Sequence, residues 1–303
     1  MKIRKNQRKS FAAIAVFLIT GLFAAACGSS SGSGAAAPSG TPSGAVSSIA
    51  AQVPASIRSQ GTLTVAADAT YAPNEFIGSD GHTVVGMDAD LAHALGQVLG
   101  LNVNVVNATF DTIIPGLASG KYDLGMSSFT DTKVRQQTVD FVTYFEAGTS
   151  FYVKSSGGPN ITSLADLCGH KVAVEKGTTE QTDAQAQAGK CTAAGKAAVS
   201  VEIFNDQNAV NLALSSGRAD VAMADSPVAE FQVKQSSGTF KLSGQPYGTA
   251  PYGIAIPKNN GMAKPVLAAV KHLMANGTYA QILTKWGVQA GAITNPVING
   301  ATS

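Results

Sequence analysis

The sequence predicts an α/β protein, and three observations lead to this class. Stretches of alternating or β-branched apolar residues take turns with stretches of helical periodicity along most of the chain. Polar residues gather where several of the strand-like stretches end. The length of 303 residues suffices for roughly two domains. Such alternation favours a parallel or mixed sheet with covered faces.

The first unit opens with a short helix, 49–59, and the alternating, β-branched strand 61–67. The segment 91–99 is predicted to be a helix because its apolar residues recur on one face. Asp88 and Asp90 stand at its start, where carboxylates cap free N–H groups. The other predicted elements of this unit are a loop with a short helix over 110–120 and the strands 101–106, 122–126, 138–142 and 150–154.

A second unit begins near Ser155. Its strands 171–175 and 219–224 each end in polar residues, and α/β sheets bind ligands at the carboxyl ends of their strands. The remaining predicted elements are the strands 199–204 and 252–257 and the helices 161–167, 181–188, 208–216, 228–234, 262–276 and 279–285. The tail from Gln289 onward is small and polar, and it is expected to fray.

The N-terminus has the three parts of a secretory signal, 1–26: a basic start, an apolar run too short for a comfortable membrane span, and small residues. Cys27 follows them directly and resembles the lipidated cysteine of bacterial lipoproteins. Ala24 departs from that pattern, which usually has leucine at this place. We expect a lipoprotein anchored to the outer face of the bacterial cell membrane. Soluble secretion with cleavage near Ala26 is the alternative.

Residues 27–48 are almost entirely Ser, Gly, Ala and Pro, which predicts a flexible tether. Beyond residue 26 the chain has 16 Lys and Arg against 19 Asp and Glu, so the formal charge of +2 becomes −3. A nucleic-acid partner would require a basic patch, and none is indicated.

Cys168 and Cys191 are an even pair in an exported chain, which predicts a disulfide. Two buried thiols are the alternative. No spacing of cysteine or histidine indicates a zinc site, and the four histidines form no catalytic pattern. No cofactor and no metal are expected.

The segment from Lys121 to Arg135 joins a short strand to a row of hydroxyl residues, Ser127, Ser128 and Thr130. Small hydroxyl residues at a strand end expose backbone N–H groups, and a nearby guanidinium adds a bidentate fork, so the pattern suits a carboxylate ligand. An ordinary helix cap with a solvated arginine is the alternative.

A series of further motifs runs in order along the chain. They are Tyr71-x-Pro73-x-Glu75-Phe76, Gly86-x-Asp88-x-Asp90-Leu91, Phe110-Asp111, Ser119-Gly120-Lys121-Tyr122-Asp123, Val139-Asp140-Phe141, Gly177-Thr178-Thr179 and Ser216-Gly217-Arg218-Ala219-Asp220. Because these motifs occur in this order, the chain from about Leu63 to Trp286 resembles the extracellular solute-binding proteins of polar amino-acid ABC importers, which form solute-binding protein family 3.

The resemblance implies a two-lobe, periplasmic-binding-protein-like (type II) fold with the ligand in the cleft between the lobes. Crossings would lie near 152–155 and 248–252, with lobe 1 formed by 49–153 and 250–287, lobe 2 by 154–249, and a tail at 288–303. The chain would act as a monomer that binds an amino acid and delivers it to a membrane permease and its ATPase.

The resemblance also implies roles for individual residues. Arg135 would bind the ligand's carboxylate, assisted by Ser127, Ser128 and Thr130. Gly177, Thr178 and Thr179 would add N–H groups from the other lobe, and Asp225 would take the α-ammonium. The aromatic residues Tyr71 and Phe110 would stack on the ligand's side chain, with Asp68 at the same mouth. The alternatives are core aromatics for Tyr71 and Phe110, and a helix cap for Asp225.

Glu175 lies two residues before Gly177, where the family often places a selectivity residue, and we hypothesise that it favours a cationic ligand such as arginine, lysine or histidine. No catalysis is required. The rival is an enzyme of the cyclohexadienyl dehydratase type, which shares the fold and the arginine and for which Glu175 could supply an acid or base. A sensory module is a third possibility. It is the least favoured, because no kinase, transmembrane or coiled-coil segment follows the domain in this sequence.

Overall fold

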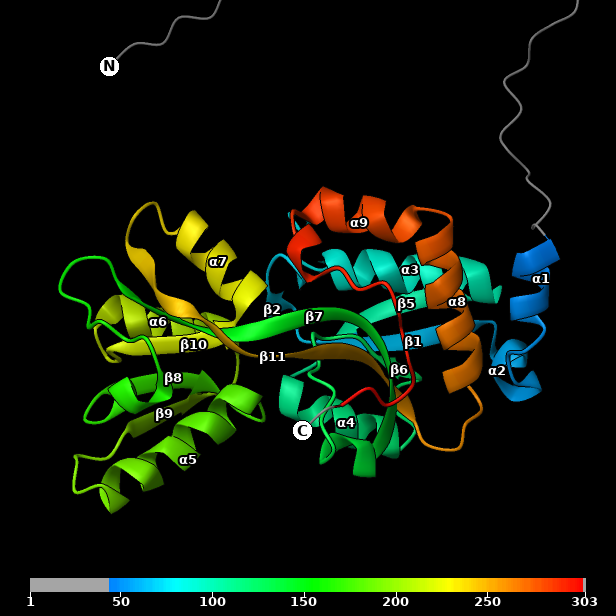
Figure 1. The fold of residues 1–303 in the computed structure, drawn as a ribbon. Coiled ribbons are helices and arrows are strands. Elements are labelled where there is room, and N and C mark those ends of the chain that lie inside the picture. Colours follow the sequence, from blue (N-terminus) through cyan, green and yellow to red (C-terminus); the bar gives the residue numbers. More distant parts are fainter. Residues whose placement is uncertain (1–43, 302–303) are drawn as a thin grey trace, which may run out of the picture. The chain divides into compact units, whose positions relative to one another are not determined.

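The computed structural model describes residues 44–301, which form one eight-stranded sheet, a small three-stranded sheet and the helices around them (Figure 1). The large sheet has the order β5-β1-β6-β11-β7-β10-β8-β9. Its strands are β1 (Thr62–Ala67), β5 (Asn102–Asn107), β6 (Leu124–Gly125), β7 (Val139–Lys154), β8 (Lys171–Glu175), β9 (Ser200–Phe204), β10 (Val221–Asp225) and β11 (Phe240–Pro257). The small sheet consists of β2 (Thr70–Tyr71), β3 (Glu75–Ile77) and β4 (Val84–Val85).

The helices fall mainly where apolar periodicity predicts them. They are α1 (Gly44–Ala50), α2 (Ala55–Gln60), α3 (Met87–Leu99), α4 (Phe110–Ala118), α5 (Thr179–Ala193), α6 (Gln207–Ser216), α7 (Ser226–Gln235), α8 (Ala263–Ala275) and α9 (Thr278–Trp286), with 3-10 turns η1 (Arg135–Gln137), η2 (Leu164–Leu167) and η3 (Gln289–Gly291). The sheet is mixed, because β1 runs parallel to β5 and β6 while β7 and β11 run antiparallel to each other. The predicted α/β class is therefore confirmed.

Two long strands connect the two halves of the sheet. The first half contains β5, β1 and β6, the second half contains β10, β8 and β9, and β7 and β11 pass through both (Figure 1). The prediction had split β7 into two strands and had seen only the end of β11. Residues 149–153, which the prediction placed in lobe 1, pair with β10 of the second half, so β7 changes partner before the predicted crossing at 152–155.

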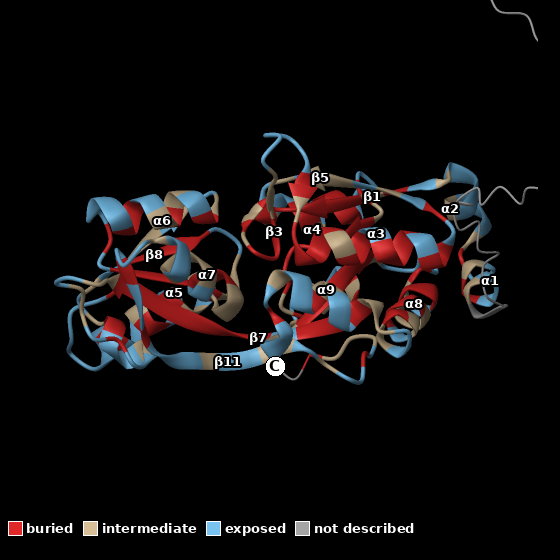
Figure 2. Cartoon of the chain, turned by 90° about the horizontal axis from the view of Figure 1, so that it is seen from above, coloured by how far each residue is buried: buried red, intermediate tan, exposed pale blue. Residues whose placement is uncertain are grey.

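Helices cover both faces of each half. In the first half α3, α8 and α9 pack on one face and α4 on the other. In the second half the side chains of β10 alternate: Val221 and Met223 belong to the core beneath α5, whereas Ala222 and Ala224 belong to the core beneath α6 and α7. The central strands are accordingly buried, whereas the outer helix faces, the edge strands β5 and β9 and the middle of β11 are partly or fully exposed (Figure 2).

The predicted capping role of Asp88 and Asp90 is wrong. Gly86 occupies the N-cap of α3, and no side chain caps this helix end. The Asp88 carboxylate instead accepts hydrogen bonds from the Ser128 N–H (3.0 Å) and the Tyr144 hydroxyl (2.8 Å). Asp90 accepts a hydrogen bond from the Trp286 indole, so both acids connect α3 to distant parts of the chain.

The tail is not frayed, contrary to the prediction, at least as far as residue 301. It runs beside the first-half segment of β7, where Ala292 bridges to Phe145 and Ile298 bridges to Val142. Asn299 exchanges two hydrogen bonds with Phe141, one from its backbone N–H and one to its side-chain oxygen. Small polar residues fit here because the tail pairs through its backbone and covers a free strand edge.

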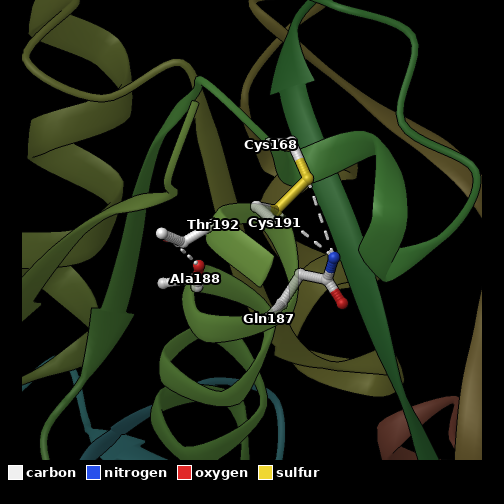
Figure 3. The surroundings of a disulfide bond; sticks show 5 residues. All are labelled: Cys168, Gln187, Ala188, Cys191 and Thr192. Carbon is white, nitrogen blue, oxygen red and sulfur yellow. Dashed lines mark hydrogen bonds between the residues drawn. A yellow bond between two sulfur atoms is a disulfide. The ribbon is translucent and has the colours of Figure 1, made fainter. Parts of the chain in front are cut away.

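A disulfide joins Cys168, just after η2, to Cys191 in α5, with Cα atoms 5.6 Å apart (Figure 3). The Gln187 amide lies 3.4 Å from the Cys191 sulfur. The predicted signal 1–26 and the lipidation residue Cys27 lie outside the described residues, as does most of the tether, and α1 begins within the last part of the range 27–48. Within residues 44–301 no helix is long and apolar enough to span a membrane.

Candidate functional site

A cavity lies where the two halves of the sheet meet, and residues of both halves form its wall. The atom-free space around it, counted up to the open solvent, is about 380 Å³. The lining residues are Tyr71, Phe110, Ser128, Thr130 and Arg135 from the first half and Thr178, Thr179, Glu180, Gln207, Met223, Ala224, Asp225 and Val228 from the second. The cavity therefore lies between the two predicted lobes.

The Arg135 guanidinium is held in place from three sides. One nitrogen, Nη1, donates to the Thr130 carbonyl at 2.9 Å, and Nη2 donates across the cavity to the Gly177 carbonyl at 3.0 Å. The guanidinium carbon lies 5.2 Å from the centre of the Phe110 ring, within cation–π range. An arginine fixed in this way presents a preorganised positive charge to an anionic group in the cavity.

Aromatic rings form one wall beside this arginine. Phe110 stacks on Phe129 with ring centres 4.5 Å apart, and Tyr71 lies against Phe110 at 5.7 Å. Tyr71 and Phe110 are buried, yet both line the cavity. They are thus core aromatics and cavity residues at once, which unites the two alternatives left open by the sequence.

The N-terminus of α5 forms the opposite wall. Thr178 is its N-cap, and its hydroxyl accepts a hydrogen bond from the Gln181 N–H at 3.2 Å. The N–H groups in the first turn of a helix have no partner within the helix, and the helix dipole gives this end a partial positive charge. With Thr178 and Thr179 in the wall, this helix end and Arg135 can bind the same carboxylate.

Two acids line the cavity on the second half. Asp225 is the N-cap of α7 but its side chain makes no cap hydrogen bond, so it is not the simple helix cap that the sequence left open. Burial and the neighbouring Glu180 carboxylate raise the pKa of Asp225 well above its usual range. Glu180 is itself buried and accepts a hydrogen bond from the Thr149 hydroxyl at 2.7 Å, at the point where β7 crosses between the halves.

Four of the predicted site residues do not line this cavity. Asp68 is buried behind it and accepts from the Thr70 hydroxyl (2.7 Å) and the Phe110 N–H (2.9 Å), while the Ser127 hydroxyl accepts from the Asp68 N–H (2.8 Å). Gly177 contributes its carbonyl to Arg135 rather than a donor to the cavity. These residues shape the wall from behind.

Glu175 is the fourth. It is 1% exposed, and neither of its carboxyl oxygens has a hydrogen-bond partner among the described residues. Burial and the neighbouring Asp68 carboxylate raise the pKa of Glu175 to about 10, so this side chain is a neutral acid at pH 7. The Tyr71 hydroxyl is buried beside this carboxyl and has no other partner within residues 44–301. Unpaired groups of this kind are costly unless a ligand uses them.

Sequence reasoning missed five lining residues. Glu180 directly follows the Thr178-Thr179 pair and could have been found from its place in the first helical turn. Gln207 begins α6 at the tip of β9, the same kind of position that identified Asp225. Met223, Ala224 and Val228 carry no polar signal, because they look like any buried strand or helix residue.

Further contacts join the halves beside the cavity. The Lys176 ammonium lies 2.7 Å from the Asp111 carboxylate, and the Gln207 N–H donates to the Thr70 hydroxyl at 3.2 Å. Each pair has one member on each half. In the described part of the chain no three His, Cys, Asp or Glu side chains are grouped so that they could hold a metal ion.

Two sheet halves joined by crossing strands, with a charged cavity between them, define a binding protein that encloses a small solute. The chain belongs to the bacterial extracellular solute-binding proteins, family 3, whose family model matches residues 63–289. The predicted two-lobe fold is that of its relatives.

Among these relatives is the arginine-binding protein ArgT of Corynebacterium glutamicum, 32% identical over 82% of this chain and 82% of its own. A solved ancestral arginine-binding protein with bound arginine is 38% identical, covers 75% of this chain and 98% of its own, and superposes with a TM-score of 0.69. An ancestral amino acid-binding protein described as a precursor of cyclohexadienyl dehydratase is 35% identical over 76% of this chain and 97% of its own, with a TM-score of 0.68. A further relative is the ABC transporter arginine-binding protein 1 of Escherichia coli, 31% identical over 74% of this chain and 90% of its own.

Proposed function

We propose that this protein captures a cationic L-amino acid, arginine first among the candidates, between the two halves of its sheet. It then delivers the amino acid to the permease of an ABC importer. The α-carboxylate binds Arg135 and the N-terminus of α5, and the α-ammonium binds Asp225 and Glu180. Because Arg135 belongs to one half and the two acids to the other, one ligand bridges the halves and binding favours closure.

The observation that carries the choice of a cation is the number of acids around the cavity. Asp225 and Glu180 line it and Asp68 and Glu175 lie behind it, whereas Arg135 is the single lining cation among the described residues. A ligand with an additional positive charge favours the ionised forms of these acids, which their burial disfavours. The arginine-binding relatives support the same choice.

Calorimetric titration with arginine, lysine, histidine and glutamine tests this proposal. We expect micromolar or tighter binding of at least one cationic amino acid and its loss in Arg135→Ala. Glu175→Gln should weaken arginine but not glutamine, while Glu202→Gln, on the surface beside Arg218, serves as the control. Since Glu175 is protonated near neutral pH and only a cationic side chain favours its ionised form, arginine should release more protons on binding than glutamine.

Absence of binding for all amino acids, or full binding by Arg135→Ala, would contradict the proposal. Turnover of prephenate or arogenate would replace it with the dehydratase alternative.

The second part of the proposal is that Cys27 carries a lipid anchor and that the segment after it tethers the domain to the membrane. The extracellular family and the signal-like N-terminus support this location. Replacement of Cys27 by serine should release the exported protein from the membrane fraction into the medium. An unchanged membrane fraction would exclude the anchor.

A further inference from the structure

Two buried carboxyl groups lie together beneath the cavity wall. Glu75 on β3 is 0% exposed and Asp88 at the start of α3 is 1% exposed. The Asp88 N–H donates to the Asn74 carbonyl at 2.9 Å, which joins the two elements. Only glycine permits this approach, because a Cβ on Gly86 would lie 2.2 Å from the Asn74 oxygen. Neither acid forms an ion pair with a lysine or arginine of residues 44–301.

Both acids hold Ser128, which lines the cavity. Its N–H donates to Asp88 at 3.0 Å, its hydroxyl donates to Glu75 at 3.3 Å, and the Asn74 side-chain amide donates to that hydroxyl at 2.9 Å. Ser128 has a φ of 51°, the left-handed region that costs free energy for any residue with a Cβ. These buried contacts offset that cost. They also occupy the N–H and the hydroxyl of Ser128, the two donors that the sequence analysis assigned to the ligand.

Geometry indicates which acid carries the charge. Asp88 accepts from the Ser128 N–H and from the Tyr144 hydroxyl of β7, whereas Glu75 accepts the longer bond from the Ser128 hydroxyl and shares a side-chain hydrogen bond with Asp88. Burial and the neighbouring Asp88 carboxylate raise the pKa of Glu75 well above its usual range, with Asp68 adding to the effect. Two carboxyls so close together retain one proton between them, and it belongs to Glu75.

We propose that Asp88, with Glu75 as its proton-bearing partner, is a positioning residue for ligand binding. It fixes Ser128 in the left-handed conformation and thereby orients the segment that leads to Thr130, whose carbonyl accepts a hydrogen bond from Arg135 (2.9 Å). The effect on affinity rests on the proposed function, whereas the effect on Ser128 does not.

The test compares Asp88→Asn with Asp90→Asn in the full chain. Asp90 is the same residue type on the same helix, but it contacts Lys285 and Trp286 outside the cavity. Arginine affinity is measured by calorimetry, and the exchange of the Ser128 amide is measured by NMR without ligand. Asp88→Asn should weaken arginine about tenfold or more, the loss expected when a buried charged acceptor is removed. Its Ser128 amide should exchange faster, while Asp90→Asn binds like the wild type.

Glu75→Gln provides the second arm, since an amide can donate to Asp88 as a protonated carboxyl does. We expect it to retain more affinity than Asp88→Asn. Equal arginine affinity in Asp88→Asn and Asp90→Asn would overturn the inference, as would an unchanged Ser128 amide in Asp88→Asn. A loss in Glu75→Gln as large as in Asp88→Asn would overturn the assignment of the proton. If the wild type binds no amino acid, the proposed function fails, and the Ser128 amide still decides the positioning role.

Discussion

Gly177 is a position where one added carbon would meet the opposite half of the sheet. Its φ is +82°, and a Cβ would lie 2.9 Å from the Asp111 Cβ and 3.2 Å from the Asp111 Cα on the opposite half. The nearer distance is shorter than carbon atoms tolerate, and the obstacle includes backbone. Gly177→Ala therefore requires the halves to stand farther apart, which also lengthens the bond from Arg135 to the Gly177 carbonyl, now 3.0 Å.

The expected magnitude has two parts. An alanine at positive φ costs about 1–2 kcal/mol whether the halves are open or closed. The clash and the weakened charged hydrogen bond act only on closure, and because Arg135 is half-buried we take the lower end of about 1.5–3 kcal/mol for such a bond. Arginine affinity should fall about tenfold.

Gly195→Ala is the matched control. Gly195 has a φ of +71° and no atom of residues 44–301 within 4 Å of the added Cβ, so this variant has the backbone strain without the clash. Urea unfolding should show similar destabilisation of the two variants, and calorimetry should show weakened arginine binding in Gly177→Ala alone. Equal affinities would refute the reasoning that the halves approach this closely in the ligand-bound protein.

Three further predictions concern other contacts of the same structure. A double-mutant cycle with Asp111→Ala and Lys176→Ala should give a coupling of about 0.2–1 kcal/mol in arginine affinity, as for other partly exposed pairs, and strictly additive effects would argue against a role in closure. The pKa of Glu175 is about 10 in the folded protein against a usual 4.5, so the unfolded chain loses this proton first as the pH rises. The contribution of Glu175 to the free energy of unfolding is therefore complete below pH 4.5 and is lost as the pH rises towards 10. Urea unfolding between pH 5 and 9 should therefore show stability declining less in Glu175→Gln than in the wild type, and identical slopes would contradict the buried neutral acid. Deletion of residues 289–303 should lower Tm and promote association, because it uncovers the edge of β7. If the shortened protein keeps its Tm and stays monomeric in size-exclusion chromatography, the tail does not protect this strand edge.

Local periodicity was sufficient to predict most elements, but not the course of the two long strands. In β7 the run breaks at Glu146 and Gly148, and in β11 Gly244, Pro246 and Gly248 resemble loop residues. Their extended conformation depends on partners supplied by both halves, with register shifts near these residues, and one sequence segment contains no information about such partners.

The candidate site was predictable where residue chemistry is specific. Arg135 and the hydroxyls near it suit a carboxylate, and the structure brings them into one cavity with Thr178 and Asp225. Asp88 was misassigned because an acid in the first turn of a helix ordinarily caps it, whereas here tertiary contacts with Ser128 and Tyr144 determine its role.

The path of β7 and β11 has a consequence for the order in which the chain can fold. The second half is made from one continuous stretch, whereas the first half needs β1 from near the beginning and the end of β11, α8, α9 and the tail. During synthesis the second half can pair its strands once residues 240–243 of β11 have emerged, but the first half stays incomplete until residue 299 is available to Phe141. All residues that line the cavity lie between Tyr71 and Val228, yet the half that carries Arg135 is completed only by segments that follow them in the sequence.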